Sequence, residues 1–202
     1  MDALSLIKSK VAEFHAEIEK AGSEQEQIID RYISELKPII IAEKTAAMNE
    51  DFQQRNGPSV LLNMYRFELS MFYDDAVSSD PDKVNKVKGM LYRSLDFMME
   101  TAAIQAWMYI EALRTLFPHD EEARERAKAA EKILYKQPGY KEFINVIKHL
   151  QAAEEAENIL KVEFMKRKYQ IGYDRAVKSK DTSLIDYYLD EIKKIEGQQT
   201  AC

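Results

Sequence analysis

The side chains best suited to chemistry in this sequence are its glutamates and histidines, which could hold a metal ion together. Helical di-iron sites take glutamates from two helices and a Glu-x-x-His motif from each of two others. Glu68, Glu100 and Glu111 fall in segments with a helical pattern, but none of the three histidines follows a glutamate by three residues. The single cysteine, Cys202, offers neither an internal disulfide nor a cysteine-based metal site. We therefore predict no metal and no cofactor.

Motifs for covalent catalysis and for phosphate binding do not occur in this chain. It has no G-x-S-x-G nucleophile elbow, no internal cysteine and no glycine-rich phosphate loop. A pocket that collects carboxylates and tyrosines from distant segments, with Glu100 and Glu111 as examples, remains open. We expect a non-enzymatic protein, with a cofactor- or ligand-binding helical-bundle enzyme as the alternative.

The one locally basic segment spans residues 161–181, where seven lysines and arginines stand against three acidic residues. Tyrosines alternate with these cations, a mixture that suits contacts to phosphates together with stacking on bases. The competing interpretation is a solvated helix face with its tyrosines in the core. Because the net charge of the chain is −6, nucleic-acid binding is only a weaker alternative. The candidate phosphate contacts are Lys166, Arg167, Lys168, Tyr173 and Arg175.

A candidate partner surface comes from the helix expected at 81–117. Asp80 and Pro81 suit a helix start, and Pro118 ends the pattern. On a helical wheel of residues 93–117, an ordinary apolar face opposes a polar one, but four large apolar residues lie on or beside the polar side. Either neighbouring helices cover them or they contact a protein partner. We predict as partner-binding residues Phe97, Ile104, Trp107 and Met108.

Capping and breaking residues divide the whole chain into helices, and no strand-like alternation occurs. Ser23 and Glu26 have the spacing of a capping box, and prolines and glycines at 56–58 and 138–139 mark breaks. We predict an all-α fold of seven or eight helices, as an antiparallel bundle or a solenoid-like array of helix pairs. The two long helices are expected near 81–117 and 140–178. In the helix after Pro58, the residues assigned to the core are Val60, Leu61, Met64, Phe67, Met71 and Phe72.

The domain organisation expected from the sequence is one helical domain over 1–197 and a flexible tail at 198–202. The pattern Y-D-x-A-V-x-S at 73–79 recurs at 173–179, offset by 100 residues. This repeated pattern raises the hypothesis that 1–100 and 101–197 arose by duplication of one unit. The alternative is that amphipathic helices ending in a polar turn resemble one another.

Composition and sequence pattern indicate where the protein is located and what it binds. No apolar run approaches the length of a membrane span, and the N-terminus lacks a signal-peptide core. We therefore predict a cytoplasmic protein with no membrane span. A narrow apolar seam at 4–18 has coiled-coil spacing. The expected role is a helical interaction, scaffold or adaptor module that binds a protein partner or a second copy of itself.

Overall fold

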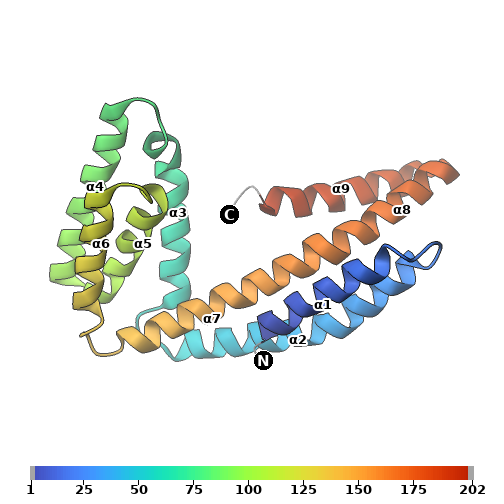
Figure 1. Ribbon diagram of the computed structural model, residues 1–202, viewed down its shortest axis with the longest axis horizontal. Coiled ribbons are helices and arrows are strands. Elements are labelled where there is room, and N and C mark those ends of the chain that lie inside the picture. Colours follow the sequence, from blue (N-terminus) through green and yellow to red (C-terminus); the bar gives the residue numbers. More distant parts are fainter. Residues whose placement is uncertain (1–2, 200–202) are drawn as a thin grey trace. The chain divides into compact units, whose positions relative to one another are not determined.

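The computed structural model describes residues 3–199 and confirms the all-α fold class, since helices and no strand occur in that range (Figure 1). The chain divides into two compact units, which are described separately here. The first unit combines residues 1–48 with 149–202, and the second is formed by 49–148. These boundaries do not coincide with residue 100. The single domain over 1–197 and the duplication stay predictions.

The first unit is built from two long helical segments and two shorter helices. Its elements are α1 (Ala3–Ile18), α2 (Gln25–Gln53, to residue 48), α7 (Tyr140–Ile159, from residue 149), the π-helical segment η2 (Leu160–Met165), α8 (Lys166–Ser179) and α9 (Thr182–Gln199). α7, η2 and α8 follow one another without a break, as predicted for 140–178 (Figure 1). Pro38 lies inside α2.

Buried aromatic and aliphatic side chains from α1, α2, α7 and η2 form the core of the first unit. The ring of Phe14 lies 4.5 Å from that of Phe164 and 5.4 Å from that of Tyr32, measured between centroids. These ring pairs stabilise the folded unit by more than their buried area alone would, because tilted aromatic rings attract each other. The remaining core residues are Ile7, Ile18, Ile28, Ile29, Leu36, Ile40, Ala156 and Leu160.

α8 and α9 form a tight hairpin. Lys180 ends α8 in the left-handed conformation with φ 59°, and the Asp181 carboxylate accepts a hydrogen bond from the Leu184 N–H at 3.2 Å. Gly172 in α8 lies directly beneath the ring of Tyr188 in α9. α9 continues to Gln199, so residues 198 and 199 of the expected tail are helical, and the rest of that segment, 200–202, lies outside the described residues.

The second unit contains α3 (Pro58–Ala76), α4 (Pro81–Thr101), the short 3₁₀ segment η1 (Ala103–Ala106), α5 (Trp107–Leu116) and α6 (Glu121–Leu134) (Figure 1). The helix start predicted at Asp80 is confirmed by its cap, and Asp120 caps α6 in the same way. The Asp80 carboxylate accepts from the Asp82 N–H at 3.0 Å, and the Asp120 carboxylate accepts from the Ala123 N–H at 2.8 Å. Such caps satisfy N–H groups that have no partner within the helix.

The helix expected over 81–117 is interrupted at Ala102, which has φ −153° and ψ 64°. The Thr101 hydroxyl donates to the Phe97 carbonyl at 2.8 Å, a side-chain bond that competes with the helical ladder and bends helices. The following residues 103–106 form a 3₁₀ turn, which rotates by about 120° per residue instead of about 100°. A single helical wheel therefore does not describe 93–117.

Candidate functional site

The four predicted partner-binding residues do not form one surface. Trp107 and Met108 are buried, with 4% and 1% of their surface exposed, whereas Phe97 is 60% exposed and Ile104 is half-buried. Burial leaves little surface of Trp107 and Met108 for a partner, because the break at Ala102 changes the direction of the helix that follows. Partner binding at the four residues stays a prediction with weakened support. The Trp107 ring lies 5.6 Å from Tyr65 and 5.8 Å from Phe143, within the core of the second unit.

The basic segment 161–181 is largely neutralised by acidic side chains of neighbouring helices. Lys168 binds Asp30 of α2 at 2.5 Å, and Lys166 binds Glu196 of α9 at 2.8 Å. Arg175 forms an ion pair with Glu26, the guanidinium of Arg167 lies 5.9 Å from the centre of the Phe14 ring, and Tyr173 is half-buried. These side chains connect helices, which leaves little free charge for a phosphate backbone. Nucleic-acid binding stays a prediction with weakened support.

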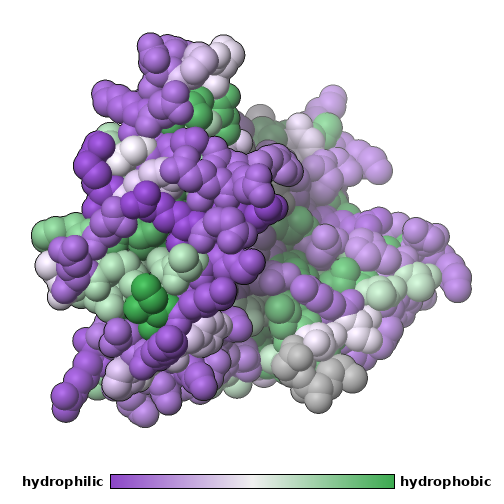
Figure 2. Space-filling view, turned by 60° about the vertical axis from the view of Figure 1, so that its left-hand side comes forward, coloured by the Kyte–Doolittle hydropathy of each residue, from purple (hydrophilic) through white to green (hydrophobic). Residues whose placement is uncertain are grey.

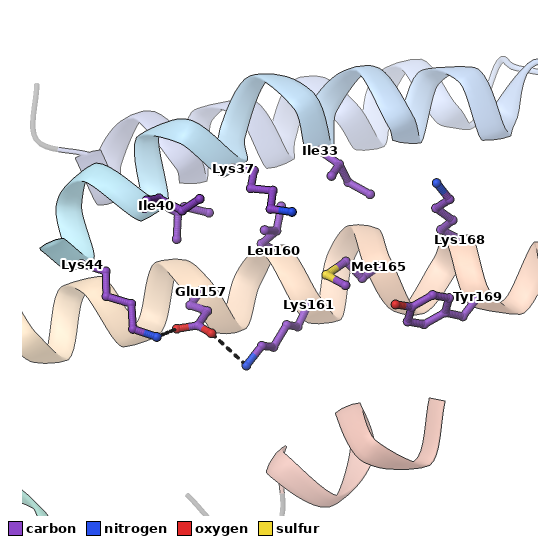
Figure 3. Close-up of a pocket in the computed structure, with 11 residues that line it drawn as sticks. Ile33, Lys37, Ile40, Lys44, Glu157, Leu160, Lys161, Met165, Lys168 and Tyr169 are labelled. Atoms are coloured by element: carbon purple, nitrogen blue, oxygen red, sulfur yellow. Dashed lines mark hydrogen bonds and ion pairs between the residues drawn. The ribbon is translucent and has the colours of Figure 1, made fainter. Parts of the chain in front are cut away.

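A groove runs between α2 and the continuous α7–η2–α8 segment of the first unit. It encloses about 370 Å³, within the range of ordinary ligand pockets. Leu160 and Ile40 are almost fully buried beneath it, and Ile33, Ile41 and Met165 complete an apolar floor. Figure 3 shows α2 beside the second helix, with Ile33, Ile40 and Lys37 of α2 and Lys168 of the second helix directed into the space between them. Glu157 and Lys161 are drawn on the side of the second helix away from α2, and Lys44 reaches across to them.

Four lysines surround this apolar floor. Lys37 and Lys44 come from α2, and Lys161 and Lys168 come from η2 and α8. The only carboxylate among the lining residues is that of Glu157. Its oxygens bind Lys44 at 2.5 Å and Lys161 at 3.1 Å (Figure 3). The groove thus has an excess of positive charge.

Three of the four groove lysines are paired with carboxylates in the described part of the chain, and one is not. The hydrogen bond from Lys44, assisted by Lys161, lowers the pKa of the Glu157 carboxyl although partial burial opposes the shift. Lys168 is held by Asp30 at 2.5 Å. Lys37 has no ion-pair partner among residues 3–199. A ligand with negative charge can therefore bind Lys37 without displacing an internal acid.

The lysines recur every seven residues on both sides of the groove: 37 and 44 on one helix, 161 and 168 on the other. The two ion pairs that close the groove, Asp30–Lys168 and Lys44–Glu157, are separated by 14 residues of α2, or about 21 Å at ~1.5 Å per residue. A third helix of about four turns has this length. Seven-residue spacing of charges beside an apolar seam is the arrangement at the e and g positions of coiled coils.

The wall of the groove contains the only π-helical segment in the described part of the chain. Leu160, Lys161 and Met165 belong to η2, where the Lys166 N–H bonds the Lys161 carbonyl, five residues back. A π segment widens a helix by inserting a residue, at a cost in hydrogen-bond geometry, and such segments concentrate at functional sites. Their position here supports a functional reading of the groove.

The sequence carries a signal for this groove in two separate segments. Lys161 and Lys168 belong to the basic segment 161–181, whereas Lys37 and Lys44 lie in α2, more than 100 residues away. The matching lysine spacing of 37 and 44 with 161 and 168 becomes meaningful once the two segments are known to be neighbours.

The glutamates and histidines considered above do not come together as a site within residues 3–199. No group of three His, Cys, Asp or Glu side chains is arranged there to hold a metal ion. Glu111 is bound to Arg114 at 2.7 Å, and Glu100 is exposed on α4. None of the described helices has the length and hydrophobicity needed to cross a bilayer.

Comparisons with protein-family models, with curated protein sequences and with solved structures found no match to this chain. The groove is therefore interpreted from its own geometry.

Proposed function

We propose that this protein is a helical interaction module that binds an acidic amphipathic helix of a partner protein in the groove between α2 and α7–η2–α8. The bound helix would place an apolar stripe on Ile33, Ile41 and Met165 and direct glutamates or aspartates to the lysines on either side. This is the helix-in-groove mode of recognition, in which apolar anchors supply affinity and flanking charges set orientation.

The observation that carries the proposal is the pair of lysines, seven residues apart, on each side of one apolar floor. A small anionic ligand would need only one or two of these lysines. Four lysines along about 21 Å instead suit a helix with negative charges repeated along its length. The lining carboxylate and phenol, Glu157 and Tyr169, are not poised for catalysis. Glu157 is bound by two lysines, and burial raises the pKa of Tyr169. A bundle enzyme has no comparable support.

The test uses a fluorescein-labelled peptide of about 18 residues with leucine at a and d and glutamate at e and g, a pattern that forms an acidic amphipathic helix. Fluorescence anisotropy measures its binding to the full chain. We expect Lys37→Glu with Lys161→Glu to weaken binding at least about tenfold, which is about 1.4 kcal/mol. Ile41→Asp, which places a charge on the half-exposed lip of the floor, is expected to act similarly.

Matched controls lie away from the groove. Lys132→Glu with Lys193→Glu reverses two exposed lysines elsewhere, and Ile133→Asp changes an isoleucine that is 51% exposed, close to the 54% of Ile41. Both should leave binding within about twofold of the unchanged protein. Equal binding by the groove variants, or equal affinity for the same peptide with lysine in place of glutamate, would contradict the proposal. So would binding to anionic phospholipid vesicles in the absence of peptide binding.

A further inference from the structure

α3 in the second unit is apolar on two opposite faces. One face is buried in the unit through Leu61, Leu62 and Ala76. On the other face Val60, Met64, Phe67 and Met71, which the sequence analysis assigned to the core, are exposed by 59%, 47%, 64% and 52%. Apolar side chains likewise form patches among hydrophilic ones on the face of the molecule drawn in Figure 2. Half-exposed large side chains in a continuous row mark a binding surface.

The spacing of the four exposed residues is that of a coiled-coil seam. Steps of four, three and four residues place Val60 and Phe67 at d positions and Met64 and Met71 at a positions. The row is about 16 Å long at ~1.5 Å per residue. The two methionines are flexible and polarizable, which suits a surface that must fit against another helix.

The charges at the two ends of this row indicate which helix it fits. At the N-terminal end stands Arg55, which has no ion-pair partner among residues 3–199. The N-terminus of α3 itself is capped by the Asp51 carboxylate, which accepts from the Ser59 N–H at 2.8 Å and from the Ser59 hydroxyl at 2.6 Å. At the C-terminal end are Asp74, also without an ion pair there, and Asp75, which binds Lys83 at 3.3 Å. Arg55 at one end of the row and Asp74 at the other, each unpaired in the described part of the chain, are complementary in an antiparallel pair of copies.

We propose that α3 pairs antiparallel with α3 of a second copy of this chain about a two-fold axis between Met64 and Phe67. In this register Val60 meets the Met71 position of the other copy, and Met64 meets the Phe67 position. Asp74 and Asp75 then lie at the N-terminal end of the opposite α3, close to Arg55. A parallel pair would instead place the aspartates of the two copies side by side. The interface is isologous and closes as a dimer.

This pairing is separate from the groove proposal, because none of its residues lines the groove. Sedimentation equilibrium of the full chain, at protein concentrations from about 1 to about 500 µM, measures the dissociation constant of the dimer. In a monomer–dimer equilibrium the average mass rises with protein concentration. We expect Phe67→Glu to raise the dissociation constant at least about tenfold. Ile133→Glu on α6, at 51% exposure, is the matched surface control and should not change it.

A charge exchange tests the orientation. Arg55→Glu alone and Asp74→Lys alone should each weaken the dimer several-fold, whereas the double variant should restore the dissociation constant to within about twofold of the unchanged chain. Circular dichroism verifies that each variant is folded. A monomer at every concentration, dimerisation unaffected by Phe67→Glu, or failure of the double variant to recover would overturn the proposal. Phe67-dependent binding to phospholipid vesicles by a monomeric chain would overturn it too.

Discussion

Glu68 illustrates how one partly buried carboxylate affects the pH dependence of stability. It is half-buried on α3, where its Oε1 accepts a hydrogen bond from the Tyr109 hydroxyl at 3.3 Å. Its Oε2 is buried and has no hydrogen-bond partner. Burial raises the pKa of Glu68 although the bond from Tyr109 acts in the opposite direction. The folded state therefore binds a proton at this carboxyl more readily than the unfolded state does.

The sign of this shift predicts that Glu68→Gln stabilises the second unit near neutral pH. A raised carboxyl pKa means that the ionised group costs folding free energy above that pKa, and that this cost disappears below the unfolded value of about 4.3. We expect a gain in unfolding free energy of less than about 1 kcal/mol, reduced by solvent screening, that fades as the pH falls toward about 4. Thermal unfolding at several pH values measures it.

The control for this prediction is Glu125→Gln, which changes an exposed carboxylate on α6 that lies 3.5 Å from Lys128. Its effect should stay within about 0.5 kcal/mol at every pH. A loss of stability in Glu68→Gln near neutral pH would show that the ionised carboxylate is needed in the folded unit.

At the scale of elements, the α8–α9 hairpin depends on the absence of a side chain at Gly172. A Cβ placed there would lie 2.4 Å from Cζ of Tyr188 and 2.6 Å from its Cε1. Such distances are far shorter than ordinary contacts, so the ring or the helix must move. A glycine inside a helical pattern ordinarily weakens the helix, whereas the structure gives Gly172 a packing role.

We predict that Gly172→Ala lowers the free energy of unfolding by about 1–3 kcal/mol, because overpacking outweighs the gain in helix propensity. Gly89→Ala in α4 is the matched comparison. There the nearest atom to a new Cβ is Arg93 Nη1 at 3.5 Å, an ordinary contact, so the substitution should stabilise by up to about 1 kcal/mol. Urea unfolding followed by circular dichroism compares them, and changes of the same sign in both variants would refute the packing role.

The sequence predicted where helices begin better than it predicted which helix faces are buried. Asp80 and Asp120 reveal helix starts because their carboxylates act on N–H groups two or three residues away. The break at Ala102 carries no such signal, since alanine favours helix and the Thr101 hydroxyl bond beside it also occurs at Thr45 inside the unbroken α2. The groove was not predicted because it joins segments more than 100 residues apart, and only tertiary pairing reveals their common lysine spacing.

At the scale of the whole chain, the first unit has a core of its own although its two segments are interrupted by 49–148. α2 and α7 are neighbours where the interruption begins. The His149 ring nitrogen lies 2.6 Å from a carboxylate oxygen of Glu43, and Lys44 binds Glu157 at 2.5 Å. A short connection can therefore replace the second unit without separating these helices.

We predict that residues 1–48, joined to 149–199 by a Gly/Ser linker of about six residues, fold without the second unit. Six residues reach up to about 20 Å, enough to turn back between neighbouring helices. Circular dichroism should show high helix content and thermal unfolding should be cooperative. A chain without a cooperative transition would contradict this and show that the first unit requires residues 49–148. A shuffled 149–199 segment on the same linker is the control and should not fold.

The split of the first unit also sets an order of events on the ribosome. The partners of Phe14 and Tyr32 include Phe164, so α1 and α2 emerge long before the residues that cover them. At ~5–20 residues per second, the intervening ~110–150 residues take some 5–30 seconds to synthesise. During that interval the nascent chain presents an uncovered apolar face while residues 49–148 can already fold. Chaperones that bind nascent chains have their clearest opportunity on the first helical pair of this protein.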